Sequence, residues 1–281
     1  MALLDPLLRN AFAADHAKIK SAQIGTKHAH ASGKIGTMRK FSDLYDFVAV
    51  VEPDDARWDA VKNSEPYKGV RRISEAELLK NDEVQLIAVE TEVRDLLDTA
   101  ERCVDAGKHI HLDKPAGEDL AHFSKILEKA SSQELNVQMG YMFRYNPGFQ
   151  FLFRAIRSGW LGEIFEVHTV MSKKVNDNTR RQLNEYPGGT MFELGCHIID
   201  ALITAIGPPD KVTAFTRRTR KSDPLADNQL AVFEYPIATA TVRSSVVEVA
   251  GGGRRQFVAC GTKGTIEILP LETPHLVMTL E

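Results

Sequence analysis

The sequence has 281 residues and a formal net charge of −3, with 43% hydrophobic and 26% charged residues. At roughly 100–200 residues per domain, this length predicts one large or two medium domains, and the composition is typical of folded chains. The small net charge excludes a global field that would favour nucleic acid or an anionic membrane, so we expect neither as a partner. No apolar run approaches the ~18–20 residues that a membrane-spanning helix needs.

The cysteines and the N-terminal residues indicate the cellular compartment in which the protein is expected. The three cysteines, Cys103, Cys196 and Cys260, are scattered and form no CxxC pair, which excludes a disulfide framework and fits a reducing compartment. The N-terminus lacks the basic region and continuous apolar run of a secretory signal. We expect residues 1–17 to form a short amphipathic arm and the protein to be cytoplasmic.

Residues 18–139 alternate strand-like runs with segments of helical spacing. Helical spacing covers residues 75–79, 96–104 and 121–130, and Gly107 ends the second segment. The strand-like runs are apolar enough for a parallel sheet buried on both faces; they are residues 20–25, 47–52, 84–89, 109–112 and 136–139. This alternation predicts an α/β domain with a doubly wound parallel sheet.

Residues 140–281 have a different pattern, with helices predicted over 146–158 and 191–206. Strand-like runs follow one another with short turns, such as those at 251–253 and 262–264; the runs are 164–171, 211–216, 229–235, 238–249, 255–260 and 265–269. Successive strands with short turns predict an α+β domain with a mostly antiparallel open sheet. The pattern of the last residues, 276–281, also predicts a strand.

The first strand ends in the turn Gly25-Thr26-Lys27. A dinucleotide site needs a strand, a glycine turn and a helix whose free N–H groups face the pyrophosphate. The first glycine is in place, whereas Lys27 replaces the second. Glu52 closes the second strand, where an acid accepts hydrogen bonds from the ribose and repels a 2′-phosphate, which favours NAD over NADP. An ordinary βα turn with a solvated Lys27 is the alternative interpretation.

Two histidines in the same turn invite a metal interpretation. His28 and His30 alternate along the turn, but the sequence supplies no third ligand beside them. Two ligands are too few for a zinc site, so we expect no metal.

Lys114 is the first candidate for chemistry. It follows the strand-like run 109–112, and ligands bind at the carboxyl edge of such sheets. Pro115 disfavours the α-helical conformation at Lys114, and a cis bond between the two is an open alternative. A lysine near a nicotinamide and a substrate hydroxyl can donate a hydrogen bond and favour the alkoxide. The alternative interpretation is an exposed lysine in a turn, without a catalytic role.

Glu193, His197 and Asp200 form the second candidate group. On a helix starting near Thr190, Glu193 and His197 are four residues apart and share a face. An acid one turn before a histidine can orient the imidazole and tune its basicity. A Glu/His pair on a solvated helix surface is the alternative.

Together, three segments resemble the glucose–fructose oxidoreductase / inositol dehydrogenase / MocA (Gfo/Idh/MocA) family. Residues 106–115, AGKHIHLDKP, resemble the family's AGKHVxxEKP segment, with Asp113 in place of its glutamate. Residues 140–147, GYMFRYNP, resemble its GxxxRxNP entry into the second domain. Residues 188–200 resemble its GGGxxxDxGxHxxD helix, with Glu193 in place of an aspartate.

The resemblance implies an N-terminal NAD-binding Rossmann domain, residues 18–139, and a substrate and oligomerisation domain, residues 140–281. It implies hydride transfer between NAD, or less favourably NADP, and a sugar, polyol or cyclitol. Lys114 then assists proton transfer, His197 is the general base and Glu193 supports it. Arg144 and Asp200 are expected to bind substrate. The expected cofactor-binding residues are Gly25, Thr26, Lys27, Glu52, Val89, Glu90, Thr91, Asp113 and Lys114.

Three further expectations follow from the resemblance. Members often form homo-oligomers through the C-terminal sheet. They usually continue for several elements beyond the last strand here, so we expect a shortened or truncated C-terminus. Two alternative functions stay open, namely an NAD-dependent glycosidase or lyase that holds its cofactor, and a non-catalytic protein that binds sugars or nucleotides.

Overall fold

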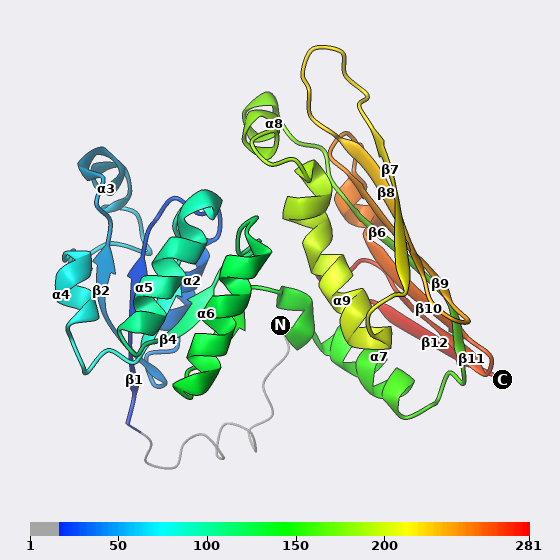
Figure 1. The fold of residues 1–281 in the computed structure, drawn as a ribbon, viewed down its shortest axis with the longest axis horizontal. Coiled ribbons are helices and arrows are strands. Elements are labelled where there is room, and N and C mark those ends of the chain that lie inside the picture. Colours follow the sequence, from blue (N-terminus) through cyan, green and yellow to red (C-terminus); the bar gives the residue numbers. More distant parts are fainter. Residues whose placement is uncertain (1–16) are drawn as a thin grey trace. The chain divides into compact units, whose positions relative to one another are not determined.

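The structure, a computed structural model, describes residues 17–281. The arm expected over residues 1–17 therefore lies outside the described residues, apart from its last position. The chain divides into two compact units between Gly140 and Tyr141 (Figure 1). Each unit is described by itself below.

The first unit contains a five-stranded sheet in the order β2-β1-β3-β4-β5, and every neighbouring pair is parallel. The chain leaves β1 for β2 on one side and returns to β3 on the other. That reversal opens a crevice at the carboxyl ends of β1 and β3, where ligands bind in open α/β sheets. The strands are β1 (Ile19–Ile24), β2 (Tyr45–Val51), β3 (Leu86–Val89), β4 (His109–Leu112) and β5 (Val137–Met139).

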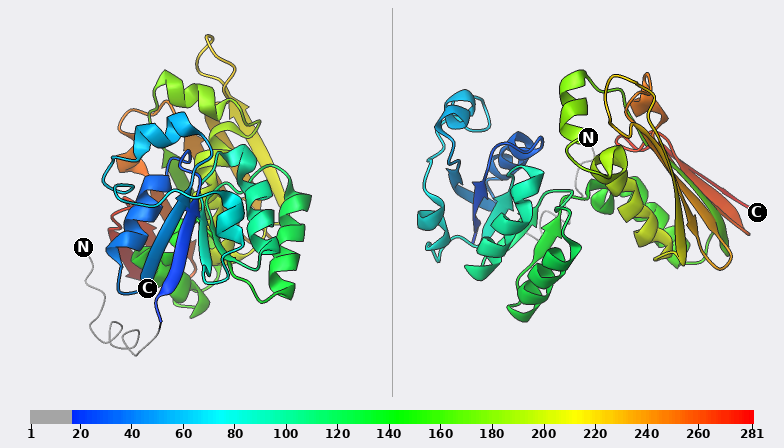
Figure 2. Two further views of the ribbon diagram at one scale, coloured as in Figure 1. Left: turned by 90° about the vertical axis from the view of Figure 1, so that its left-hand side faces the viewer. Right: turned by 45° about the horizontal axis from the view of Figure 1, so that its top comes forward.

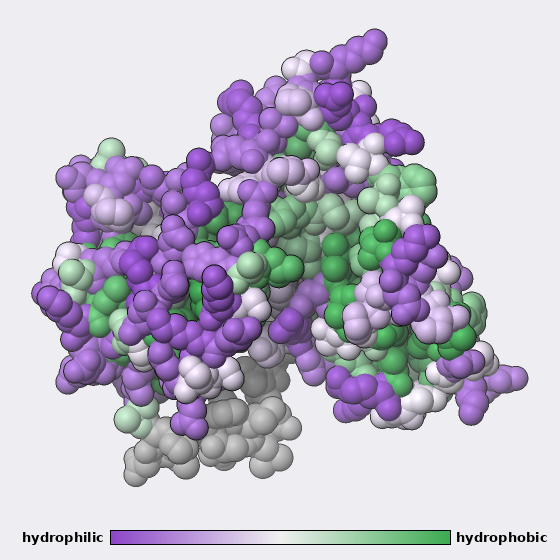
Figure 3. Space-filling view, viewed as in Figure 1, coloured by the Kyte–Doolittle hydropathy of each residue, from purple (hydrophilic) through white to green (hydrophobic). Residues whose placement is uncertain are grey.

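Two apolar clusters cover the two faces of this sheet. Val50 packs with Ile35 and Tyr67 in one cluster, whereas Val51 packs with residues of α5 and α6 in the other. Consecutive residues of a strand point to opposite faces, so the two clusters lie on opposite sides. Polar residues cover most of this unit's visible surface (Figure 3). The helices are α2 (Ala31–Lys40), α3 (Asp55–Val61), α4 (Glu75–Leu79), α5 (Leu96–Asp105) and α6 (Leu120–Ser132), with the 3₁₀ turn η1 (Val93–Asp95).

The second unit contains a seven-stranded sheet in the order β12-β11-β10-β6-β9-β8-β7. All its neighbouring pairs are antiparallel except β6 and β9, which run parallel. The strands are β6 (Ile164–Ser172), β7 (Lys211–Arg217), β8 (Asn228–Glu234), β9 (Thr239–Ser245), β10 (Gln256–Gly261), β11 (Gly264–Ile268) and β12 (Leu276–Leu280).

Helices pack on one face of this second sheet (Figures 1 and 2). Buried residues of α7 and α9, including Phe149 and Leu202, join Val167, Ala240 and Ile266 of the strands in one apolar core. The helices are α7 (Pro147–Arg157), α8 (Asp177–Leu183) and α9 (Cys196–Ile206), with η2 (Met142–Tyr145), η3 (Met191–Gly195) and η4 (Gly251–Arg254).

The predicted fold class is confirmed: a parallel α/β sheet precedes a mostly antiparallel one. Two local predictions differ from the structure. The turn expected at 251–253 is a 3₁₀ helix. The helix expected over 191–206 begins with a π-helical turn, η3, and becomes α-helical only at Cys196. Among residues 17–281, no helix is long and apolar enough to cross a membrane.

Candidate functional site

The turn after β1 lies against the end of β3. Gly25 has a φ of +86°, and a Cβ added to it would lie 2.7 Å from the carbonyl carbon and oxygen of Glu90 and from the amide nitrogen of Thr91. The amide of His28 donates to the carbonyl of Glu90 at 3.1 Å. Only glycine combines this left-handed backbone with so close an approach, so Gly25 fixes the turn at the switch point of the sheet.

Glu52, at the end of β2, is engaged within the turn. Its Oε2 accepts hydrogen bonds from the amide of Thr26 at 3.1 Å and from Thr26 Oγ1 at 2.7 Å. Its Oε1 accepts from the amide of Asp54 at 3.1 Å, and Lys27 Nζ lies 3.3 Å from Asp54. Glu52, which was predicted to face a ribose, is only 3% exposed. Its carboxylate holds the glycine turn in place.

A cavity of about 250 Å³ opens at this carboxyl edge. It is lined by Gly25, Lys27, Glu52 and Thr91, which were predicted to bind the cofactor, and by residues of α5 and the loop before it. Its remaining charged lining residues are mostly acidic; they are Glu75, Glu92, Asp95, Asp98 and Arg102.

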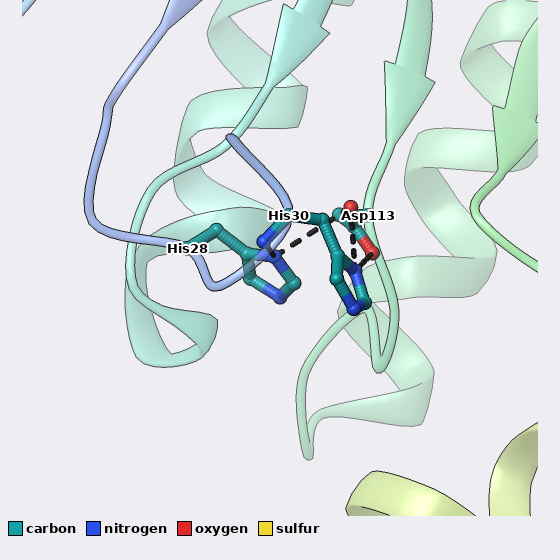
Figure 4. Close-up of side chains that lie close together, drawn as sticks. All are labelled: His28, His30 and Asp113. Atoms are coloured by element: carbon teal, nitrogen blue, oxygen red, sulfur yellow. Dashed lines mark hydrogen bonds and ion pairs between the residues drawn. The ribbon is translucent and has the colours of Figure 1, made fainter. Parts of the chain in front are cut away.

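A second group of side chains meets beside the turn, at the ends of β3 and β4. Asp113 is fully buried, and its carboxylate lies 3.0 Å from His30 Nδ1, 3.5 Å from His28 Nδ1 and 3.7 Å from Lys34 Nζ. Glu90 Oε2 lies 3.6 Å from His28 Nδ1. Figure 4 shows both histidines converging on Asp113. We call His28, His30, Glu90 and Asp113 the His/acid cluster.

Burial sets the protonation of the His/acid cluster. It raises the pKa of Glu90 to about 9, with help from the neighbouring charge of Asp113. It lowers the pKa of His28 to about 4, against the attraction of Asp113. Burial opposes ionisation of Asp113 too, but the hydrogen bond from His30 and the nearby positive charge of Lys34 hold the pKa of that carboxyl below its usual range. The cluster therefore holds one ionised and one protonated carboxyl at neutral pH.

Lys114 directly follows this cluster in the chain. Its side chain is buried, with a relative exposure of 2%, and its amide donates to the carboxylate of Asp113 at 2.6 Å. The Lys114–Pro115 peptide bond is cis. The alternative of an exposed turn lysine is therefore wrong, since Lys114 is held at the carboxyl edge of the sheet.

In the second unit, His197 and Glu193 have different surroundings. The His197 ring is 5% exposed and meets Tyr141 and Phe143 edge-on, with ring centroids 6.3 and 5.9 Å away. Glu193 Oε2 lies 3.9 Å from Lys173 Nζ. Because a π-helix closes i→i+5 bonds and Glu193 lies within η3, the α-helical spacing assumed for this pair does not hold. Their joint role stays a prediction.

The two residues expected to bind substrate bind each other. Arg144 donates through Nε and Nη2 to the Asp200 carboxylate at distances from 2.5 to 3.1 Å. Its guanidinium also lies over the Tyr141 ring, 5.4 Å from the centroid. This pair fastens the start of the second unit to α9.

The chain belongs to the GFO/IDH/MocA oxidoreductase family. Residues 19–141 match the domain described as an oxidoreductase family NAD-binding Rossmann fold, and residues 149–267 match the GFO/IDH/MocA C-terminal domain. These two matches cover most of the chain, so the predicted family membership is confirmed.

Similar sequences include the uncharacterized oxidoreductase YhhX of Escherichia coli, 29% identical over 67% of this chain and 54% of YhhX. Another is the NADP⁺-dependent scyllo-inositol 2-dehydrogenase IolW of Bacillus subtilis, 23% identical over 85% of this chain and 67% of IolW. This chain thus spans about half the length of YhhX. In the solved structure of Bordetella pertussis WlbA dehydrogenase, with NADH and UDP-GlcNAcA, the TM-score is 0.82 at 16% identity. That comparison covers 94% of this chain and 77% of WlbA and shows the shared fold.

The family implies a nicotinamide dinucleotide, and the first unit fits its nucleoside half. The cavity lies at the switch point and is lined by the turn glycine, the β2 acid and the end of β3, as a dinucleotide site requires. The phosphate end differs, because Lys27 replaces the second glycine of the turn and the His/acid cluster lies beside it.

The turn predicts opposite effects for two glycine-to-alanine substitutions. Gly25→Ala should lower the free energy of unfolding by more than about 2 kcal/mol, because it adds a left-handed alanine and a clash with backbone atoms. Gly33→Ala should be neutral or raise it by up to about 1 kcal/mol, because this helical glycine has nothing within 4 Å of an added Cβ. Urea unfolding of both variants without nucleotide tests this. Equal effects of the two substitutions would contradict the close packing of the turn.

Proposed function

We propose that the protein is an NAD-dependent dehydrogenase or reductase that acts on a hydroxyl or carbonyl carbon of a sugar, polyol or cyclitol. The observation that carries the proposal is the burial of Lys114 at the carboxyl edge of a parallel sheet, beside the cofactor turn of a family NAD-binding domain. Two relatives support the substrate class: IolW is named for an inositol substrate, and the WlbA structure holds a nucleotide sugar.

NAD(H), when bound, supplies or accepts the hydride. The chain's own residues would position the substrate and move its proton. The Lys114 ammonium would donate to the substrate oxygen and lower the cost of its negative charge. His197 would take the hydroxyl proton in oxidation, with its ring orientation fixed by Tyr141 and Phe143. Glu193 would support His197.

Lys114→Met tests the role of the ammonium group. We expect it to reduce kcat by about 100-fold or more, because it removes a proton donor from the reacting oxygen. NADH affinity, measured by fluorescence titration, should change much less than turnover. The assay uses NAD⁺ with a panel of cyclitols, aldoses and nucleotide sugars.

Lys125→Met is the matched control, since Lys125 is an exposed residue of α6 and loses the same charge. It should keep the turnover of the unaltered protein. Unchanged turnover in Lys114→Met would exclude the proposed role, and failure of both variants and the unaltered protein to bind NADH would exclude the dehydrogenase itself.

We further propose that NAD is preferred over NADP. The cavity is lined by five carboxylates and two cationic side chains, so a 2′-phosphate would add negative charge to an acidic surface. NADH should bind at least about 10-fold more tightly than NADPH, which corresponds to roughly 1.4 kcal/mol. Titration with both nucleotides at the same ionic strength measures the ratio. Equal affinities would contradict the proposal.

The open face of the second sheet is our proposed interface between copies of the chain. The face opposite the core includes Val258, His168, Thr241 and Val232, which lie in one row across four paired strands. These side chains are only partly buried within one chain. A second copy would remove this mixed apolar and β-branched surface from water.

Val258→Lys tests this interface, because a lysine at the β10 end of the row would place a charge between the two copies. We expect the oligomer of the unaltered protein to dissociate to the monomer in sedimentation equilibrium. Ser158→Lys, at the exposed end of α7, adds the same charge away from the sheet and should leave the mass unchanged. A monomeric unaltered protein, or an oligomeric Val258→Lys variant, would refute the interface.

A further inference from the structure

One carboxylate joins the turn after β1 to the end of β4. His30 Nδ1 lies 3.0 and 3.2 Å from the two carboxylate oxygens of Asp113, a residue 83 positions further along the chain. Asp113 Oδ1 also accepts the amide hydrogen of Lys114 at 2.6 Å. An ionised carboxylate can only accept hydrogen bonds, so His30 is the donor. Asp113 therefore connects the ring of His30 to the peptide that carries Lys114.

The Asp113 carboxylate has little room to turn away from these donors. Asp113 is fully buried, and a buried charge is costly unless it is hydrogen-bonded. A Cβ added to Gly140 would lie 2.9 Å from Asp113 Oδ1, so the backbone after β5 closes one side. Glu90, which keeps its proton, is a further hydrogen-bond partner of Asp113. Removing the His30 ring would thus take a donor from a buried charge and open space beside it.

His30 is itself held by His28. The amide of His30 donates to His28 Nδ1 at 3.2 Å, and the two rings meet edge-on with centroids 4.9 Å apart (Figure 4). The His28 amide donates to the carbonyl of Glu90 at 3.1 Å, and the His28 ring forms a hydrogen bond with the backbone of Lys114. Burial lowers the pKa of His28 to about 4, so its ring is neutral at pH 7 and Nδ1 can accept.

We propose that His30, acting through Asp113, is a positioning residue that fixes where the Lys114 ammonium lies. The inference rests on the proposed dehydrogenase function, in which Lys114 donates to the substrate oxygen. In this role His30 moves no proton, and it holds the peptide from which the lysine side chain starts. A misplacement of about 1 Å in a reacting group can cost about 100-fold in rate, so loss of this contact should be visible in turnover.

A double-mutant cycle on kcat tests whether His30 acts through Lys114. His30→Ala should reduce kcat by about 10- to 100-fold. Added to Lys114→Met, it should lower kcat by no more than about threefold further, because the group that it positions is already absent. The assay uses NAD⁺ and the member of the cyclitol, aldose and nucleotide-sugar panel that the unaltered protein oxidises. Two losses that multiply in the double variant would overturn the proposal.

Two further variants separate positioning from a general effect on the fold. An asparagine side chain can supply an amide N–H in place of the histidine Nδ1–H, so His30→Asn should recover most of the turnover that His30→Ala loses. His275→Ala removes an exposed histidine of the second unit and should keep the turnover of the unaltered protein. Circular dichroism and NADH titration show that each variant is folded. Equal losses in His30→Ala and His30→Asn would contradict the role of this hydrogen bond.

Crystal structures of the variants without nucleotide test the inference independently of the activity. Lys114 Nζ should move by more than about 1 Å in His30→Ala and stay in place in His30→Asn. An unmoved Lys114 in His30→Ala would overturn the positioning role, whatever the turnover. If Lys114 moves as expected but the unaltered protein binds NADH and oxidises no member of the panel, the positioning contact is supported and the dehydrogenase proposal fails.

Discussion

The contact between Gly25 and the end of β3 is the constraint on which the rest of the first unit's site depends. The turn can approach the Glu90 carbonyl only without a side chain at Gly25. That approach brings the His28 amide to the Glu90 carbonyl, with which it forms a hydrogen bond. It also places Thr91 beside Gly25 at the edge of the cavity. Because β1 and β3 are neighbours at the reversal of the strand order, this one backbone contact lies at the edge of both the cavity and the His/acid cluster.

The cavity and the His/acid cluster lie beside the same turn but differ in the state of their carboxyl groups. Acidic residues around the cavity can only accept hydrogen bonds, which suits ribose hydroxyls and disfavours a further phosphate. In the cluster, two buried carboxyls lie close together, and burial together with the charge of Asp113 raises the pKa of Glu90 so that it keeps its proton at neutral pH. Glu52, which lines the cavity, accepts hydrogen bonds from the amide and the hydroxyl of Thr26. The turn is therefore held from both sides by carboxylates, one from β2 and one from β4.

The sequence predicted the sheets better than the site. Strands buried on both faces leave continuous apolar runs, and these runs located β1 to β5 within a few residues. No range was predicted for α2, since Gly33 and Gly36 weaken its helical pattern, and α3 and α8 are short. The contact of His30 with Asp113 spans 83 residues, so no local pattern reveals it. Motif spacing placed Lys114 correctly, but the π-helical turn at η3 could not be seen from a spacing that assumes an α-helix.

Asp113 links the two histidines of the turn after β1 to Lys114, the residue proposed to act on the substrate. Its carboxylate accepts the amide hydrogen of Lys114 at 2.6 Å and contacts both histidines. These contacts restrict the rotation of the Asp113 carboxylate, and the peptide that carries Lys114 is held with it. Second-neighbour interactions of this kind orient the groups that touch the substrate. Loss of the contact between His30 and Asp113 should therefore act on the position of the Lys114 ammonium rather than on its charge, so it would affect turnover without changing the residues proposed to perform the chemistry.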